Sequence, residues 1–177
     1  NPFIEDANVT VDDDKSIKAP ELSNFQQYSR ISSNTSYSSQ DFLSNIASEK
    51  SLKEHIVGLC EFFTKQGVDI KPYPKVIFKK DNSTEDITAP TGHYQPGVNI
   101  LTLYINGRHQ KDVLNTASHE LWHRHQDVKG ELDPEKLGES TNYSDGNDYL
   151  KKIEHEAFMQ GNVMRRMYTE SLQKQSK

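Results

Sequence analysis

The chain has 177 residues, a net charge of −5 and a hydrophobic fraction of 33%, which suit one domain of ordinary size together with a tail that is not fully packed. Its lysine and arginine residues are scattered rather than grouped in a stripe, and no apolar run approaches the roughly 20 residues needed to cross a bilayer. We therefore expect a soluble protein with no nucleic-acid partner and no membrane partner, and the single cysteine excludes a disulfide framework.

The N-terminal part of the chain is poor in apolar side chains. It contains the acidic run Asp12-Asp13-Asp14 and a serine-rich stretch over residues 29–39. Such a composition buries too little apolar surface to offset the entropy lost on ordering. We predict a flexible or extended N-terminal arm over residues 1–38, followed by a single domain over residues 39–177. Aromatic residues scattered along the arm could dock on a partner protein.

A helical pattern begins at Ser39. Apolar residues recur near helical spacing from Phe42 to Phe63, and Gly67 ends the pattern. We predict one long helix, or two helices joined near residues 49–51.

Two strands are predicted next. Residues 75–79 form a short apolar run typical of a strand, and residues 98–105 are rich in β-formers and end at Asn106-Gly107. Residues 91–97, between them, are predicted to form a turn-rich loop. We expect the second strand to lie at the edge of a small sheet, where an extended peptide could pair with it.

The rest of the chain is predicted to be helical, apart from one connector. A helix over residues 111–128 is followed by a polar connector over 129–147, interpreted as a short helix with turns or as a mobile rim of a site. Turn and N-cap residues at 144–147 then precede a last helix over residues 148–173.

The first of these two helices carries one copy of the pattern H-E-x-x-H, from His119 to His123. Two histidines four apart lie on one helix face, about 5–6 Å from each other, so both imidazoles can reach one zinc ion at about 2.0–2.1 Å. Glu120, one step round the helix, can deprotonate a metal-bound water. On a helical wheel this polar face, which includes Thr116 and Asp127, borders a separate apolar face. The pattern predicts a metal-binding helix at the edge of the core.

A catalytic zinc ion takes three protein ligands and keeps one open position. The last helix offers Glu154 and Glu156. The wheel puts Glu154 at the edge of the buried face beside Ala157 and Gly161, and small residues there would let two helices approach closely enough to share one ion. We prefer Glu154 as third ligand, with Glu156 and the connector residue Asp145 as alternatives.

These motifs resemble those of the glutamate-zincins, metallopeptidases in which a glutamate downstream of H-E-x-x-H completes the zinc site. More narrowly, residues 70–168 are similar to small metallopeptidase-like proteins encoded by tailed bacteriophages. The likeness lies in Gly92-His-Tyr-Gln-Pro96, Ile105-Asn-Gly-Arg-His-Gln-Lys-Asp-Val-Leu114, Ser118-His-Glu-Leu-Trp-His123, Glu154-x-x-Ala157 and Glu156-Ala-Phe-Met-Gln-Gly-Asn162.

The resemblance implies an α+β fold. It would be a small zincin-like domain with a short mixed or antiparallel sheet, an H-E-x-x-H active-site helix and a C-terminal ligand-bearing helix, plus the extended arm. Phe158 stands where the clan commonly has Asp. The carboxylate that orients a histidine ligand must then come from elsewhere, and Asp127 and Asp112 are candidates.

The expected function is zinc-dependent hydrolysis of a peptide bond in a protein or peptide substrate, by a zinc-activated water with Glu120 as general base. The oxyanion would need a donor, for which we favour Tyr149, with Tyr143, His93 and Arg108 as alternatives; Tyr94 and Trp122 are expected to be packing residues. The alternative function is that of a phage virion or assembly component, in which the zincin domain is structural or inactive and the arm binds phage structural proteins. The protein would then be found in the host cytoplasm or in the virion.

Overall fold

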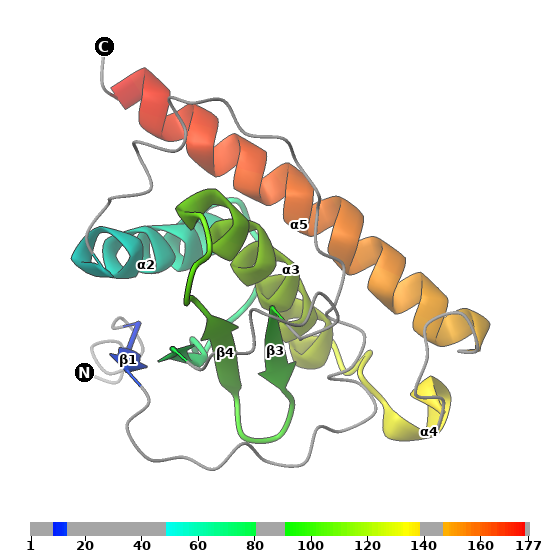
Figure 1. Cartoon of the computed structure of the whole chain (residues 1–177). Helices are drawn as coiled ribbons and strands as arrows, with labels where there is room; N and C mark the ends of the chain where they lie inside the picture. The colour runs from blue at the N-terminus through cyan, green and yellow to red at the C-terminus, as the bar shows by residue number, and fades with distance from the viewer. Residues whose placement is uncertain (1–8, 14–48, 81–90, 139–146, 176–177) are drawn as a thin grey trace, which may run out of the picture.

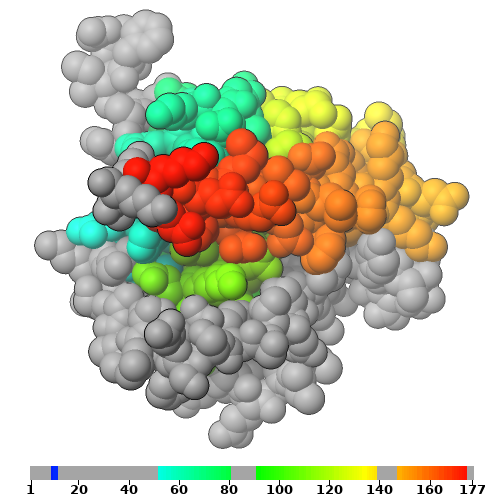
Figure 2. Space-filling view, turned by 90° about the horizontal axis from the view of Figure 1, so that it is seen from above, coloured from blue at the N-terminus to red at the C-terminus, as the bar shows by residue number. Residues whose placement is uncertain are grey.

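The structure, a computed structural model, describes residues 9–13, 49–80, 91–138 and 147–175. Helices α2 (Glu49–Lys65) and α3 (Gln110–Val128) lie over one face of a four-stranded sheet, and the long helix α5 (Asp148–Gln175) crosses on the outside of both (Figure 1). Seen from above, α5 runs along the surface of the molecule (Figure 2). The prediction of a small α+β domain with a short mixed sheet is confirmed.

The sheet has the strand order β1-β2-β4-β3. Strands β1 (Val11–Asp13), β2 (Lys75–Lys79) and β4 (Ile100–Tyr104) are parallel, and β3 (Gly92–Gln95) pairs antiparallel with β4. Three residues of the predicted N-terminal arm therefore add a strand to the sheet beside β2. Residues 9 and 10 of that arm are also described, and its other residues lie outside the described ranges.

The prediction of a loop over residues 91–97 is wrong at Gly92–Gln95, which form β3. The turn that follows contains Gly97 and Asn99, both with positive φ, and folds the chain back so that β3 pairs with β4. A run as short and polar as this one has little strand propensity of its own, and the pairing creates the strand. As a result β4 is an inner strand, and the described sheet ends at β3 rather than at the predicted strand over 98–105.

The helices follow the sequence pattern closely. α3 begins one residue before its predicted start, with the His109 side chain accepting a hydrogen bond from the Lys111 N–H at 3.1 Å, and α5 continues two residues past its predicted end. Within the predicted connector, Pro134–Leu137 form the short helix α4, capped by Asp133. The helical region predicted before residue 49 falls outside the described ranges. Among the described helices, none combines the length and the apolar character required to cross a membrane.

One hydrophobic cluster joins the helices to the sheet. α3 supplies the apolar face that the wheel predicted, beside the face that carries His119 and His123, and α5 packs against α3 from outside. The buried members include Leu59, Phe63, Val76, Phe78, Tyr94, Leu101, Leu103, Val113, Ala117, Leu121, Ile153 and Ala157. Because α3 lies between the sheet and α5, its side chains can meet groups from both.

Candidate metal centre

Three side chains from α3 and α5 converge on one point. The Nε2 atoms of His119 and His123 lie 3.0 Å apart. The Oε2 atom of Glu154 lies 3.3 Å from His119 Nε2, and its Oε1 atom lies 3.4 Å from His123 Nε2. His123 and Glu154 are fully buried, whereas 12% of the His119 side chain is exposed. Among the described residues, this is the one group of three His, Cys, Asp or Glu side chains close enough to hold a metal ion.

The two separations between a histidine and Glu154 fit a small cation. A tetrahedral ion with bonds of about 2.0–2.1 Å holds neighbouring donor atoms about 3.3–3.4 Å apart. A charge-assisted hydrogen bond between an imidazole and a carboxylate would be shorter, at about 2.7–2.9 Å. Two histidines and one glutamate are also one of the ligand sets that catalytic zinc uses. The His–Glu separations and the chemistry of the three side chains therefore suit a zinc ion, while the 3.0 Å between the two imidazole nitrogens is shorter than the ideal separation.

Small residues on α5 allow this convergence, as the sequence suggested. A Cβ added at Gly161 would lie 3.0 Å from the Cα and N atoms of His119 and from the carbonyl oxygen of Ser118. The two helices thus touch through main-chain atoms at this point. Glu154 is two turns earlier on α5 and reaches the histidines from the same side.

Without an ion, the cluster holds a proton instead. Burial would lower the pKa of His123, but the Glu154 carboxylate opposes it and raises that pKa to about 9. Burial likewise would raise the pKa of Glu154, yet the two imidazoles beside it lower it to about 2. The metal-free protein therefore carries a protonated His123 against an ionised Glu154 at neutral pH.

The second nitrogen of His123 is held by Gln126. Nδ1 of His123 lies 2.8 Å from Oε1 of Gln126, and Nε2 of Gln126 donates to the carbonyl oxygen of Ile153 at 3.0 Å. That second bond orients the amide so that its oxygen accepts from His123 Nδ1, which leaves Nε2 turned toward the candidate ion. The prediction of Asp127 in this role is wrong, because its carboxylate pairs with Arg124 and Tyr94.

Glu120 lies beside the cluster with its side chain fully buried. One carboxylate oxygen, Oε2, accepts a hydrogen bond of 2.9 Å from the Tyr94 main-chain N–H, and Oε1 has no hydrogen-bond partner among the described residues. Strand β3 can lie this close to α3 because Gly92 has no side chain. A Cβ at that position would lie only 2.6 Å from Cγ2 of Thr116 on α3.

A small cavity, open to solvent and with room for about one water molecule, adjoins Glu120 and His119. Its wall is formed mainly by neutral polar side chains and one aromatic ring, from Thr91, Asn115, Thr116, Phe158 and Asn162. A molecule in this cavity would therefore lie against His119, a candidate metal ligand, and next to the buried Glu120.

Other predicted site residues are placed elsewhere. Glu156 accepts a hydrogen bond of 3.4 Å from Nε1 of Trp122, and the Tyr149 hydroxyl donates to the carbonyl oxygen of Glu131 at 2.9 Å. The guanidinium of Arg108 binds main-chain and side-chain oxygens of the surrounding loop and helix. None of these three lines the cavity. Asp145 and Tyr143 lie outside the described residues.

His93 is buried on the sheet face opposite to Tyr94, because neighbouring strand residues point to opposite sides. Burial lowers its pKa to about 4, and the nearby Lys79 contributes in the same direction. It therefore lies away from the candidate metal centre.

Two contributors to the site were not predicted from the sequence. Tyr94 was expected to pack, and it does, but its main-chain N–H also binds Glu120. No sequence signal marks that contact, since it depends on how β3 lies against α3. Gln126 could have been considered, because it stands three residues after His123 and so shares its helix face. Comparisons of this chain with protein-family models, with curated proteins and with solved structures find no match, so the interpretation of the site depends on its own geometry.

Proposed function

We propose that this protein is a zinc-dependent hydrolase, a metallopeptidase of the glutamate-zincin type that cleaves a peptide bond. The observation that carries the proposal is the convergence of His119, His123 and Glu154 next to a buried carboxylate, Glu120, at the wall of a cavity. The His–Glu separations and the chemistry of the three side chains support zinc. The resemblance of the motifs to the glutamate-zincins supports peptide hydrolysis.

In this proposal each residue has a distinct task. Zinc bound by the three ligands would act as a Lewis acid that polarises the scissile carbonyl and acidifies water. Glu120 takes the proton of the attacking water on Oε1 and later delivers it to the leaving amine. Gln126 keeps the proton of His123 on Nδ1, so that Nε2 stays available as a ligand.

Strand β3 is a candidate surface for an extended substrate. In an antiparallel pair the main-chain groups of alternate residues face away from the partner strand. Thr91 O accepts from Tyr104 N, so the groups of Gly92 and Tyr94 face outward, as the bond from Tyr94 to Glu120 also indicates. Glu120 holds the Tyr94 N–H, so an extended peptide could pair on this side with the main chain of Gly92 and with the Tyr94 carbonyl. The small cavity beside Glu120 would then hold the attacking water.

The test is metal analysis and hydrolysis with matched variants. We expect one zinc ion per chain after dialysis, and cleavage of a peptide library that a chelator abolishes and added zinc restores. Glu120→Gln should keep the zinc and lose cleavage, because it removes the proton acceptor but no ligand. Glu156→Gln is the control, since its carboxylate contacts Trp122 instead, and it should keep both zinc and cleavage.

Two results would overturn the proposal. Cleavage by zinc-loaded Glu120→Gln would exclude Glu120 as the base. Zinc bound to the wild-type protein without any cleavage would favour a structural role, such as that of a phage assembly component.

A further inference from the structure

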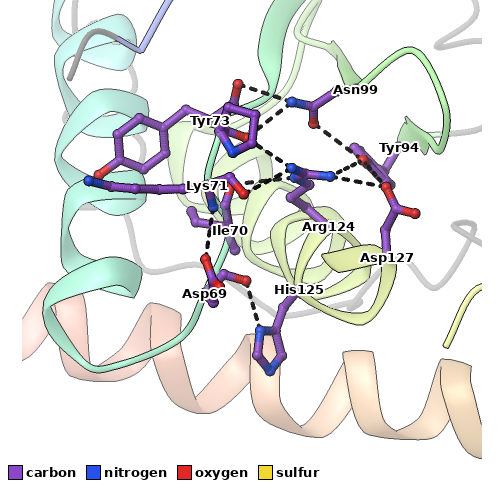
Figure 3. A network of polar contacts seen from close by, with 10 residues as sticks. Asp69, Ile70, Lys71, Tyr73, Tyr94, Asn99, Arg124, His125 and Asp127 are labelled. Carbon is purple, nitrogen blue, oxygen red and sulfur yellow. Dashed lines mark hydrogen bonds and ion pairs between the residues drawn. The ribbon is translucent and has the colours of Figure 1, made fainter. Parts of the chain in front are cut away.

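Tyr94 is bound to α3 at both of its ends. Its main-chain N–H donates to Oε2 of Glu120 at 2.9 Å, and its hydroxyl donates to Oδ2 of Asp127 at 2.6 Å. Nη1 of Arg124 in turn donates to the Tyr94 hydroxyl at 3.2 Å (Figure 3). Burial and the Asp127 carboxylate raise the pKa of Tyr94, so the hydroxyl keeps the proton that it donates.

Arg124 is a rigid anchor for this contact. It is 8% exposed and pairs with Asp127 at 3.1 Å. The rest of its guanidinium donates to three consecutive carbonyl oxygens of the segment that leads into β2, those of Ile70, Lys71 and Pro72, at 3.3, 3.1 and 3.2 Å (Figure 3). A guanidinium fixed on so many sides has little freedom to follow a moving partner.

The two attachment points lie at different heights on α3. Arg124 is about one turn and Asp127 about two turns beyond Glu120. A strand that is hydrogen-bonded at two points along the helix axis cannot slide along the helix or rotate on it without breaking a buried hydrogen bond. Breaking such a bond is costly. The Tyr94 side chain therefore locks the position of the β3 main chain relative to Glu120.

We propose that Tyr94, Arg124 and Asp127, the Tyr94 clamp, are positioning residues that hold the β3 main chain against Glu120. Oε2 is thereby fixed on the Tyr94 N–H, and Oε1 is left for the reacting water at the cavity. This rests on the proposed function for its catalytic consequence. The hydrogen bond between the Tyr94 N–H and Glu120 Oε2, which the clamp holds in place, can be measured in the metal-free protein.

The first test is amide hydrogen exchange of residue 94 in the full metal-free chain, followed by NMR. The amide should be protected in the wild type and should lose protection in Glu120→Ala, while the Tyr104 amide, bound to Thr91 O, stays protected. Tyr94→Phe keeps the amide and removes only the hydroxyl. We expect its residue-94 amide to exchange at least about tenfold faster, because the strand is no longer held at its second point.

The second test is the split between kcat and KM. In Tyr94→Phe we expect kcat to fall about 10- to 100-fold, as for a small displacement of a reacting group, with KM within about twofold and the zinc content unchanged. Tyr168→Phe is the matched control, since it removes one hydroxyl that bonds to His55 Nδ1 at 3.1 Å, between α2 and α5. It should change neither the residue-94 amide nor kcat.

Asp127→Asn serves if Tyr94→Phe does not fold, and should shift both measurements in the same direction. Unchanged protection of the residue-94 amide together with unchanged kcat would overturn the clamp. If the wild-type protein hydrolyses nothing, the proposed function fails, and the exchange experiment still decides whether the clamp exists.

Discussion

Replacing Gly161 by alanine should weaken metal binding although no ligand is changed. The added Cβ would lie 3.0 Å from main-chain atoms of His119 and Ser118, whereas carbon atoms in ordinary contact are about 3.5–4.0 Å apart. Main-chain atoms cannot rotate out of the way as a side chain can, so α5 must move outward by a few tenths of an ångström. Glu154 is carried on the same rigid helix.

A displacement of that size is large for a metal site. Ligand distances are expected to hold within about 0.2 Å. We therefore expect zinc affinity to fall about 10- to 100-fold, the range seen when the support of a ligand is disturbed. The free energy of unfolding of the metal-free protein should change less than the overpacking cost alone. Overpacking costs about 1–3 kcal/mol, but replacing glycine by alanine in a helix restores about 1 kcal/mol.

The assay is competition for zinc with a chromophoric chelator, together with thermal unfolding of the metal-free chains. Gly58→Ala is the matched control, since its Cβ would instead meet the Tyr168 hydroxyl at 2.7 Å, between α2 and α5. It should leave zinc affinity unchanged. Wild-type zinc affinity in a folded Gly161→Ala protein would refute the reasoning that the close approach of α3 and α5 sets the position of Glu154.

Two further predictions follow from the titrating groups. Zinc must displace the proton on His123, whose pKa is raised to about 9. Zinc affinity should therefore rise about tenfold per pH unit between pH 6 and 8.5, and calorimetry in two buffers should detect the release of about one proton. A zinc affinity that is independent of pH would contradict this prediction. His93 has a folded pKa of about 4, below its ordinary 6.5, so the unfolded chain binds a proton first as the pH falls. Stability should therefore drop by up to about 3 kcal/mol from pH 6.5 to 4, as measured by urea unfolding, and His93→Gln should lack this part of the pH dependence; an identical slope in the variant would exclude His93 as its source.

The sequence by itself determined the helical half of this site. Residues 119 and 123 share a helix face because of helix geometry alone, and the wheel placed Glu154 and Gly161 on the side where α5 meets α3. These inferences succeed because the period of a helix is local and needs no partner. Each helix face could therefore be predicted before anything was known about the sheet.

Only the tertiary structure decided the other half. Residues 92–95 became a strand because β4 pairs with them, and the same pairing brought the Tyr94 N–H to Glu120. Gln126, rather than Asp127, orients His123, because the Ile153 carbonyl of α5 fixes the Gln126 amide. The Asp127 carboxylate is instead bound to Arg124 and Tyr94. Strand pairing and hydrogen bonds between elements join residues far apart in the chain, so they depend on how the helices and the sheet pack together.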